Sequence, residues 1–595
     1  MMFSNISKDL NIERKDYLCL FLLLVYSAII TVLLINFNES IGIYCSDVYI
    51  YLYNSLVFAR MGYNNTYLYL SPLDFGLVEL HFLFRLGFVN EVSIYAVTGV
   101  FSIFGSLGIY VLLKRYFNSL LSLAGGVLFT SFSLNLLWWA NGTLDLPAVG
   151  LSVWAILFLI LAVDESPKYY ILSFVFLVLS IFTRYTCLFL IPLFLLYYLS
   201  KHDLFGFLDS LISDRKEAFS SLRSFLKTEE FRYLMIALVL ALIVAVLFIS
   251  VILYYGAELS FLEQGSTFAS GSKGALDDYA HTTDTLFYFH DFLNFLFSQK
   301  VIFQENFIPT LTGASYLAYL ILFILIIGIS LGIYRFFNKN KSEDKKQFDN
   351  VNSSISNLKE FSFKTSHFKT LLYIGLLLSL AIAILGFKIN SIITIAFLLI
   401  GLVIIFSLLK SKGLDRKDYS VPIFMIGWFL VYFIFFTFLN IKVNRYIITV
   451  FPAFIYFVIL ALNEIIGLLD GKSLKIGDLN LSNIIPIVLI VLCMFSAFSF
   501  TSTFEDNLDF NDYKIVADYL IDYDGDYASK DIAVFKQRTF NWWLKDSTIA
   551  VTTDQLDFLE SSNITYYICD EDLKLENYTK IYNYKDIFLY ERVNN

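Results

Sequence analysis

The chain has 595 residues, of which 57% are apolar and only 16% are charged, and its mean hydropathy is +0.67. This composition excludes a disordered chain and one large soluble domain, since a soluble protein has about 25% charged residues. The formal net charge of −9 argues against a nucleic-acid partner, and the five scattered cysteines show no CxxC or zinc-ligand spacing. The composition therefore predicts a membrane protein, with lipids as its surroundings.

Nine stretches are long and apolar enough to cross a bilayer, whose hydrocarbon core of about 30 Å takes about 20 helical residues. They are residues 17–37, 92–113, 119–140, 146–163, 234–253, 311–334, 421–440, 446–466 and 483–502. Two more stretches, 169–199 and 370–409, fit either one long helix or a hairpin, broken at Arg184 in the first and at Lys388 in the second.

Loop charge decides between these alternatives, because cytoplasmic loops carry an excess of Lys and Arg. With both stretches as hairpins and the N-terminus inside, the basic segments 201–233 and 335–369 fall on the cytoplasmic side. Collapsing either hairpin alone would move later basic loops outside. We therefore predict an α-helical multi-pass protein of the plasma membrane with about 13 transmembrane helices, a cytoplasmic N-terminus and an extracytoplasmic C-terminus.

Several segments lie between or after the spans of this transmembrane domain, 1–502. The first outer loop, 38–91, holds two apolar runs too short to cross, predicted as interfacial helices. The long outer loop 254–310 is glycine-rich and then aromatic, which predicts a lid-like loop and another interfacial helix. The cytoplasmic loop 335–369 is polar and predicted to be a flexible insertion. Residues 503–595 alternate helix-like runs with the strand-like runs DIAVF, STIAVT, ITYYICD and DIFLYERV, which predicts a small extracytoplasmic α/β domain.

Ionisable residues are scarce in the span centres, which argues against an ion-coupled transporter. Polar residues lie instead at the predicted outer ends of spans: Asp47, Asn141, Asp145, Arg184, Lys388, Lys442 and Arg445. Each alone has a structural alternative, as a helix cap or an interface anchor. Together they suit transfer from a lipid phosphate, because Arg binds phosphate bidentately and a carboxylate accepts a proton from an acceptor hydroxyl.

Residues 17–500 resemble the GT-C superfamily of polyprenyl-phosphate-sugar-dependent glycosyltransferases, especially the branch of protein O-mannosyltransferases and the lipid A aminoarabinose transferase. The matching segments are SDVYIYLYNSLVFARMG, LYLSPLDFGLVELHFLFRLGF, NGTLDLPAVGLSVWAILF, and the pair FTRYTCLFLIPLFLLYYL and VNRYIITVFPAFIYFVILAL. The resemblance implies a GT-C-like fold. One departure concerns the acceptor class: Asp47 is followed by Val48, where protein O-mannosyltransferases usually have an Asp-Glu pair.

The resemblance also implies roles for individual residues. Asp47 would be the catalytic base or acceptor orienter, with Asp145 as a second catalytic carboxylate. The donor phosphate would be bound by Arg184, Arg445 and Tyr446. Further candidates for the acceptor or the entrance are Asn141, Lys442, His81 and Arg85. For His81 and Arg85, which share one helix face, headgroup contact is the favoured interpretation.

No metal-ligand set is predicted. A divalent-ion site among the histidines and aspartates of the long loop, His281, His290, Asp277, Asp278, Asp284 and Asp291, matches no known spacing. No cofactor is therefore assigned, and a divalent metal stays an alternative.

The predicted activity is that of a hexosyl- or pentosyltransferase of the cell envelope. It would use a dolichyl- or undecaprenyl-type phosphate sugar, dolichyl phosphate mannose among them, and a glycan, lipid or protein acceptor at the extracytoplasmic face. One alternative is a lipid-linked glycan flippase or other transporter. Another is an oligosaccharyltransferase relative, which the sequence NWWLKD at 541–546 disfavours because the family motif is WWDYG. Trp542 and Trp543 are interpreted as core of the small domain.

Overall fold

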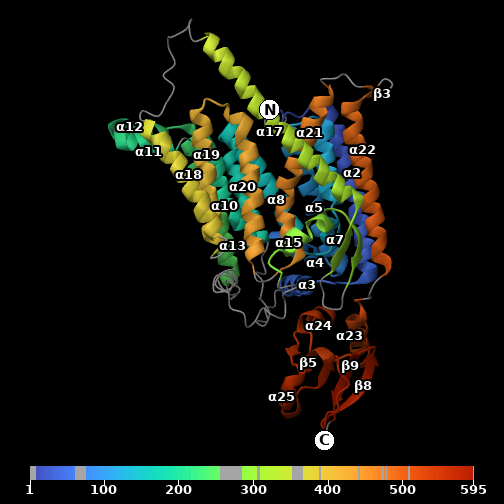
Figure 1. Cartoon of the computed structure of the whole chain (residues 1–595). Coiled ribbons are helices and arrows are strands. Elements are labelled where there is room, and N and C mark those ends of the chain that lie inside the picture. Colours follow the sequence, from blue (N-terminus) through green and yellow to red (C-terminus); the bar gives the residue numbers. More distant parts are fainter. Residues whose placement is uncertain are drawn as a thin grey trace.

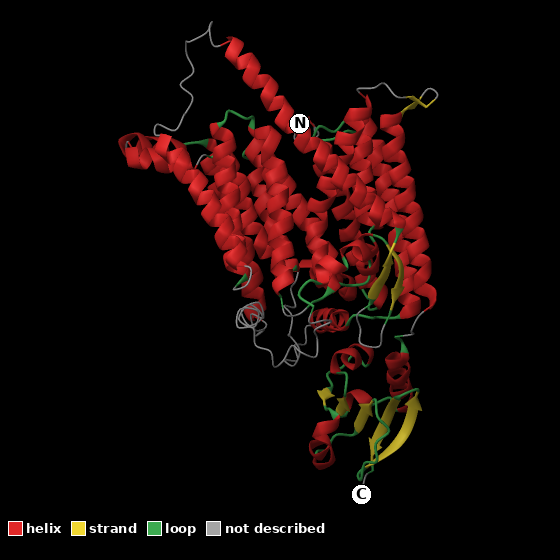
Figure 2. Ribbon diagram, viewed as in Figure 1, coloured by secondary structure: helices red, strands yellow, loops and turns green. Residues whose placement is uncertain are grey.

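The computed structural model describes residues 8–59, 75–202, 204–213, 215–254, 284–303, 309–350, 366–386, 390–439, 442–470, 475–476, 479–506 and 510–593. Long, roughly aligned helices form a bundle, and a small domain with a β-sheet lies beyond one end of it (Figures 1 and 2). The predicted multi-pass helical fold with a C-terminal α/β domain is confirmed.

Within the described residues, ten helices are long and apolar enough to cross a membrane, or eleven when the bent pair Tyr185–Lys201 and Leu204–Ile212 is included. The long helices are α2 (Arg14–Ile41), α5 (Glu91–Lys114), α8 (Asp145–Asp164), α13 (Glu229–Tyr254), α17 (Tyr316–Asn350), α18 (Ser366–Gly386), α19 (Ser391–Ser411), α20 (Arg416–Phe438), α21 (Phe451–Asp470, preceded by η3, Asn444–Val450) and α22 (Leu481–Thr501). Shorter helices cover the other predicted spans: α6 (Ser119–Ser131), α7 (Ser133–Trp138), α9 (Tyr169–Thr183), η1 (Tyr185–Phe189) and α10 (Leu190–Lys201). The predicted count of about 13 is therefore approximate.

Helix boundaries follow from local chemistry. Asn90, Asn118 and Asn390 each accept a hydrogen bond from a backbone N–H two or three residues ahead, as N-cap residues do. Arg184 separates α9 from η1 with an extended backbone (φ −149°, ψ 121°), so the first predicted hairpin breaks where expected. The second predicted break falls on 387–389, which lie outside the described residues.

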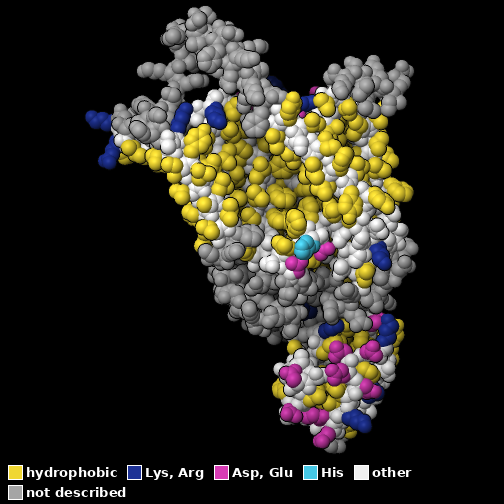
Figure 3. All heavy atoms as spheres, in the orientation of Figure 1, with side chains coloured by type: hydrophobic (Ala, Val, Ile, Leu, Met, Phe, Trp, Pro, Cys, Tyr) yellow, Lys and Arg dark blue, Asp and Glu magenta, His cyan; other side chains and the backbone are white. Residues whose placement is uncertain are grey.

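The centre of the bundle is α8, which packs on α5 and α9. A Cβ atom on Gly105 of α5 would lie 3.0 Å from the Cα of Gly150 in α8, so these two backbones meet directly. Other helices present Leu, Ile, Val and Phe side chains outward, and Figure 3 shows that such side chains cover the visible face of the bundle. This apolar belt is the surface that lipid covers in a multi-pass membrane protein.

The first outer loop contains α3 (Ser46–Ala59) and α4 (Phe75–Arg85), in the two runs predicted to be interfacial helices. Both lie between the bundle and the C-terminal domain (Figure 1). Most side chains of α3 are buried, because the helix packs on α4 and on α24 (Gln537–Trp543). α3 is therefore enclosed by protein as well as lying at the end of the bundle.

The second outer loop differs from its prediction. The aromatic run forms two short helices, α15 (Phe287–His290) and α16 (Phe292–Leu296), in place of one. A hairpin of β1 (Ser298–Ile302) and β2 (Thr310–Ala314) follows. Because 310–314 pairs with β1, α17 begins at Tyr316 and not at the predicted 311. The predicted lid-like part of the loop, 255–283, lies outside the described residues.

Five elements complete the end of the bundle opposite the C-terminal domain. There α17 continues to Asn350 into the predicted flexible insertion. The pair α11 (Leu204–Ser213) and α12 (Arg215–Phe225) connects α10 with α13, and β3 (Lys475–Ile476) pairs with β4 (Leu479–Asn480).

The C-terminal domain has a five-stranded sheet in the order β6-β5-β7-β9-β8, with β5 parallel to both of its neighbours and β9 antiparallel to β7 and β8. The strands are β5 (Ile532–Val534), β6 (Ile549–Ala550), β7 (Tyr566–Cys569), β8 (Tyr578–Tyr584) and β9 (Ile587–Arg592). The α-helices are α23 (Asp512–Tyr523), α24 and α25 (Leu556–Ser561). The short 3-10 helices are η4 (Ser502–Asp506), η5 (Tyr527–Ser529) and η6 (Thr553–Gln555). β8 is absent from the strands predicted from the sequence, because this edge strand is largely polar and partly exposed.

Trp542 and Trp543 are buried in one apolar cluster with Phe540 and Leu544 of the small domain, and this cluster continues into the bundle. Trp542 Nε1 donates a hydrogen bond to Glu91 Oε1 of the bundle at 2.7 Å, and its ring stacks on Phe84. Trp543 packs edge-on against Tyr49 of α3. The two indoles are buried at the contact between the domains, because the apolar face of α24 is turned toward the first outer loop.

The same loop is also held by the start of the C-terminal domain. Phe510 donates its backbone N–H to the carbonyl of Ile41 at 2.8 Å, and its ring packs against Tyr44. The C-terminal domain therefore contacts the chain on both sides of Asp47. Because α2 ends at Ile41 beside this domain, its first residue, Arg14, lies at the opposite end of the bundle.

Candidate active site

Four charged side chains from elements far apart in the sequence meet at the end of the bundle next to the C-terminal domain. Asp47 is the second residue of α3 and Asp145 the first of α8. Arg184 occupies the break between α9 and η1, and Arg445 lies in the first turn of η3. Each residue stands where a helix begins or breaks, which brings its side chain to the end of the bundle. We call these four residues the charged quartet.

The charged quartet alternates in sign. Arg184 donates to Asp145 Oδ1 from Nε at 3.1 Å and from Nη2 at 2.8 Å. Arg445 donates from Nη2 to Asp47 Oδ2 at 2.5 Å. Between the two pairs, Arg445 Nε lies 3.5 Å from Asp145 Oδ2, and neither atom has a hydrogen-bond partner. Within the charged quartet, the Nε of Arg445 and the Oδ2 of Asp145 are therefore close and oppositely charged but not hydrogen-bonded.

Burial is uneven within the charged quartet. The side chain of Asp145 is 6% exposed and that of Arg445 is 9%, against 18% for Arg184 and 23% for Asp47. Buried charges need opposite partners, which the alternation supplies. Asp47 is the most accessible member, and Arg445 bonds to only one of its oxygens, so a ligand can reach this carboxylate.

Asp47 is ionised at neutral pH. Burial acts to raise the pKa of its carboxyl, but the charges of Arg445 and Arg184 outweigh burial and hold this pKa below its usual range. Arg538, on α24 of the C-terminal domain, lowers the pKa of Asp47 further. The C-terminal domain therefore contributes a positive charge to the surroundings of Asp47.

Tyr446 joins the charged quartet as predicted. The guanidinium of Arg184 lies over its ring, 5.8 Å from the centroid. The sequence analysis missed two other neighbours of Arg445. Cys45 accepts a hydrogen bond from Arg445 Nη1 at 3.1 Å, and Trp138 places its ring 5.4 Å from the guanidinium carbon. No spacing in the sequence pointed to them, because each is close to Arg445 only in the folded chain.

Two candidates for the acceptor or the entrance have structural contacts instead. Lys442 is buried and donates to the carbonyls of Phe436, Thr437 and Leu439, so its ammonium caps the C-terminus of α20. Asn141 is also buried, and its Oδ1 accepts hydrogen bonds from the backbone and hydroxyl of Thr143. Both side chains are buried in contacts within the protein, and a role for them at the acceptor or the entrance stays a prediction.

His81 and Arg85 lie one turn apart on α4, as their spacing predicted. His81 is half-buried and Arg85 is exposed. Burial, followed by the charge of Arg85, lowers the pKa of His81. In the described residues, neither side chain is hydrogen-bonded or ion-paired to the charged quartet, so a role at the entrance stays a prediction.

The alternative of a divalent-ion site rests on residues of the long loop, of which Asp277, Asp278 and His281 lie outside the described residues. Lys388, a candidate at a span end, lies outside them as well. In the described part of the long loop, His290 Nδ1 lies 2.8 Å from Asp284 Oδ2, while Asp291 contacts Asn294. Among the residues that the structure describes, no three His, Cys, Asp or Glu side chains gather as metal ligands.

The fold of this chain has counterparts among solved structures. Crystal structures of ArnT from Cupriavidus metallidurans share it, both bound to undecaprenyl phosphate (TM-score 0.52, 11% identity) and in the apo state (TM-score 0.53, 12% identity). Each match covers 96% of this chain and 97% of ArnT. The oligosaccharyltransferase of Archaeoglobus fulgidus, in complex with Zn and sulfate, is less similar, with a TM-score of 0.46 and 11% identity over 92% of this chain and 68% of that chain.

A sequence comparison points the same way. The family model of the dolichyl-phosphate-mannose-protein mannosyltransferases matches residues 79–209, a segment that includes Asp145 and Arg184. Comparison with curated protein sequences gives no match. The resemblance to the GT-C superfamily predicted from the sequence is confirmed.

Proposed function

We propose that this protein is a glycosyltransferase that moves one sugar from a polyprenyl phosphate carrier to an acceptor hydroxyl at the extracytoplasmic end of the bundle. The observation that carries the proposal is the charged quartet, in which two arginines and two carboxylates meet at the end of the spans. The GT-C fold supports it, because one of the two similar ArnT structures holds undecaprenyl phosphate.

The donor phosphate is bound by Arg184 and Arg445, with Tyr446 beside them. Arginine suits this task because its planar fork of N–H groups matches phosphate oxygens and its charge is permanent. Arg445 Nε is buried, lies 3.5 Å from Asp145 Oδ2 and makes no hydrogen bond, so it becomes available to a phosphate oxygen when the guanidinium shifts toward the donor. The apolar surface beside the spans accommodates the polyprenyl chain.

Asp47 receives the acceptor hydroxyl. Its depressed pKa keeps it ionised, and phosphate binding to the arginines weakens their pull on it, so its basicity rises when donor is present. The acceptor oxygen forms a bond to the anomeric carbon while the bond from that carbon to the phosphate oxygen breaks. The hydroxyl proton passes to Asp47, and polyprenyl phosphate leaves as the anion held by Arg184 and Arg445. Asp145 keeps both arginines in place.

The test is a donor assay on the purified chain. Radiolabelled dolichyl- and undecaprenyl-phosphate sugars are supplied with membrane glycan, lipid and protein fractions, and label is followed into each fraction. We expect the wild type to release polyprenyl phosphate and to transfer label to one fraction. Asp47→Asn should lower the rate by a factor on the order of 10³, because the base and its charge are lost together.

The matched control is Asp164→Asn. Asp164 is also a carboxylate paired with an arginine, but it lies at the other end of α8, about 30 Å away at 1.5 Å per residue. This control should retain the wild-type rate in correctly assembled protein. Equal rates for Asp47→Asn and wild type would contradict the assignment. Movement of an intact labelled lipid across vesicles without sugar release would instead establish the flippase alternative.

A further inference from the structure

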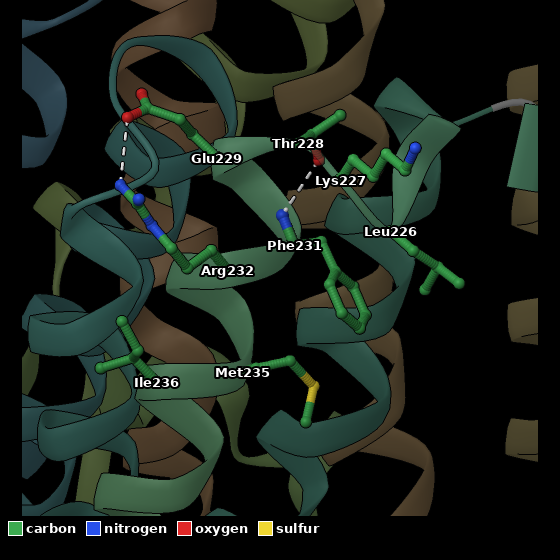
Figure 4. Close-up of a pocket in the computed structure, with 8 residues that line it drawn as sticks. All are labelled: Leu226, Lys227, Thr228, Glu229, Phe231, Arg232, Met235 and Ile236. Atoms are coloured by element: carbon green, nitrogen blue, oxygen red, sulfur yellow. Dashed lines mark hydrogen bonds and ion pairs between the residues drawn. The ribbon is translucent and has the colours of Figure 1, made fainter. Parts of the chain in front are cut away.

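A pocket of about 480 Å³ lies at the opposite end of the bundle from the charged quartet, where α12 leads into α13. Its walls are Leu226, Lys227, Thr228, Glu229, Phe231, Arg232, Met235 and Ile236 (Figure 4). These residues play no part in the proposed transfer reaction. The pocket is about one transmembrane length away from it, since Glu230 at the start of α13 contacts Tyr170 at the start of α9, and α9 ends next to Arg184.

The pocket has a polar rim and an apolar wall. Figure 4 shows Lys227, Thr228 and Glu229 at the upper edge, with Met235 and Ile236 below them. Met235 is six residues beyond Glu229, which places it about 9 Å further along the helix. The side chains of Met235 and Ile236 are 41% and 39% exposed, so the wall is open to the surroundings.

The position of the pocket is that of the lipid headgroups. α13 is a candidate span that begins at Glu229, and only 11% of its most apolar window is buried in protein. Lipid therefore surrounds most of α13. A pocket in its first two turns lies where headgroups end and acyl chains begin.

The surroundings of the pocket carry more basic than acidic residues, with Glu217, Glu229 and Glu230 against five Lys and Arg in 215–232. Arg215, Lys216, Arg223 and Lys227 are all exposed over 13 residues of α12 and the turn after it. Phe219 and Leu222 of α12 are exposed as well, and Phe219 is one helical turn from both Arg215 and Arg223. Exposed apolar and basic side chains on one short helix suit contact with an anionic membrane surface.

Two basic side chains of the pocket are available to a ligand. The Arg232 guanidinium lies over the ring of Tyr233, 5.2 Å from its centroid, and pairs with Glu229 at 3.1 Å. Both partners of the ion pair are more than 60% exposed, so this pair is weak and an anion can compete for the guanidinium. Lys227 makes no ion pair with any residue that the structure describes. Thr228 places its hydroxyl at the same rim, where it accepts a hydrogen bond from the backbone N–H of Phe231.

We propose that this pocket binds an anionic phospholipid, with the headgroup at the rim that carries Lys227 and Arg232 and one acyl chain along Met235 and Ile236. The charge of the rim selects the anionic headgroup, and the apolar wall selects a lipid over a soluble phosphate. The site does not depend on sugar transfer, and it adds a lipid ligand at the end of the bundle remote from the charged quartet.

The test compares lipid retention by full-length variants. Wild type, Lys227→Gln/Arg232→Gln and the control Lys410→Gln/Lys412→Gln are purified, placed in nanodiscs of equal phosphatidylglycerol and phosphatidylcholine, re-extracted in detergent, and assayed for bound lipid. The control removes two exposed charges from the end of α19, at the same end of the bundle. We expect wild type and control to retain phosphatidylglycerol over phosphatidylcholine by about tenfold, and the pocket variant to retain both equally.

Two results would overturn the proposal. One is equal phosphatidylglycerol retention by the pocket variant and the wild type. The other is that glycerophosphate, which has the headgroup but no acyl chains, raises the unfolding temperature of the wild type as much as phosphatidylglycerol does. Unfolding temperatures in phosphatidylcholine alone establish that the variants are folded. Ile236→Asn should halve retention or lower it further while leaving both basic residues in place.

Discussion

The two ends of the bundle both carry ion pairs between helix ends, but the pairs differ in how completely they are hydrogen-bonded. At the end remote from the C-terminal domain, Asp164 accepts hydrogen bonds from Arg416 and from the hydroxyl of Tyr197. Arg416 also donates to Ser200 and lies over the ring of Tyr197. In the charged quartet, by contrast, Arg445 Nε and Asp145 Oδ2 face each other without a hydrogen bond.

This difference separates a structural ion pair from a candidate catalytic one. The Asp164 cluster joins α8, α10 and α20, and both of its charges have internal partners. The charged quartet keeps one accessible carboxylate and one unused donor, which is what a site must offer to a substrate. Buried charges without full compensation are costly, and such costs cluster at functional sites.

The largest expected effect is a loss of transfer rate, and it comes from comparing alanine variants of Arg445 and Arg416, one at each end of the bundle. Arg445→Ala leaves Asp47 and Asp145 without their shared partner and removes a phosphate contact, so sugar release should fall by a factor on the order of 10² to 10³. Arg416→Ala removes the partner of a buried carboxylate as well, and should cost about 3 kcal/mol of stability. Initial rates at saturating donor and unfolding midpoints, measured on both variants, check this. A similar loss of rate in folded Arg416→Ala protein would contradict the assignment of catalysis to the charged quartet and of a structural role to the Asp164 cluster.

The contact between the C-terminal domain and α3 should have an intermediate effect. Trp542→Ala removes the stack on Phe84 and the hydrogen bond to Glu91, which loosens the loop that carries Asp47. We expect sugar release to fall by about tenfold, since misplacing a catalytic group by about an ångström lowers rates steeply. Backbone hydrogen exchange in residues 41–52 should rise at the same time.

Phe558→Ala is the control for that variant, because Phe558 is an aromatic residue of the same domain that is 54% exposed and lies on α25. It should change neither the rate nor the exchange. Unchanged exchange in Trp542→Ala would show that the domain does not restrain the loop.

The smallest expected effect concerns pH. Arg538 helps to lower the pKa of Asp47, so Arg538→Gln should raise that pKa. A raised pKa means that Asp47 becomes protonated at a higher pH, and the acidic limb of kcat/KM for sugar release should shift upward by less than about one unit. The control is Lys536→Gln at the N-cap of the same helix, because the Lys536 ammonium bonds to the hydroxyl of Tyr513 within the domain. A downward shift in Arg538→Gln, or an equal shift in the control, would contradict the role.

Much of the fold could be predicted from the sequence, because the bilayer requires apolar side chains along every span, and such runs can be read locally from the sequence. The predicted break at Arg184 and four strands of the C-terminal sheet are present in the structure. The β1–β2 hairpin and β8 could not be predicted, since their residues gain strand structure only by pairing with another segment. Lys442 shows the same limit for side chains: its charge at a span end is compatible with a site, and only the fold shows that it caps α20.

By itself, the sequence determined that the chain crosses the membrane many times, that it carries a small α/β domain at its end, and that a few charges remain at span ends. Only the tertiary structure decided which charges meet. Asp47 and Arg445 are almost 400 residues apart, and their contact depends on how α3, α8 and η3 pack. The structure alone also placed Trp542, Trp543 and Arg538 next to the first outer loop. The physical reason is that apolar burial is encoded residue by residue, whereas ion pairing depends on distances that exist only after the helices have packed.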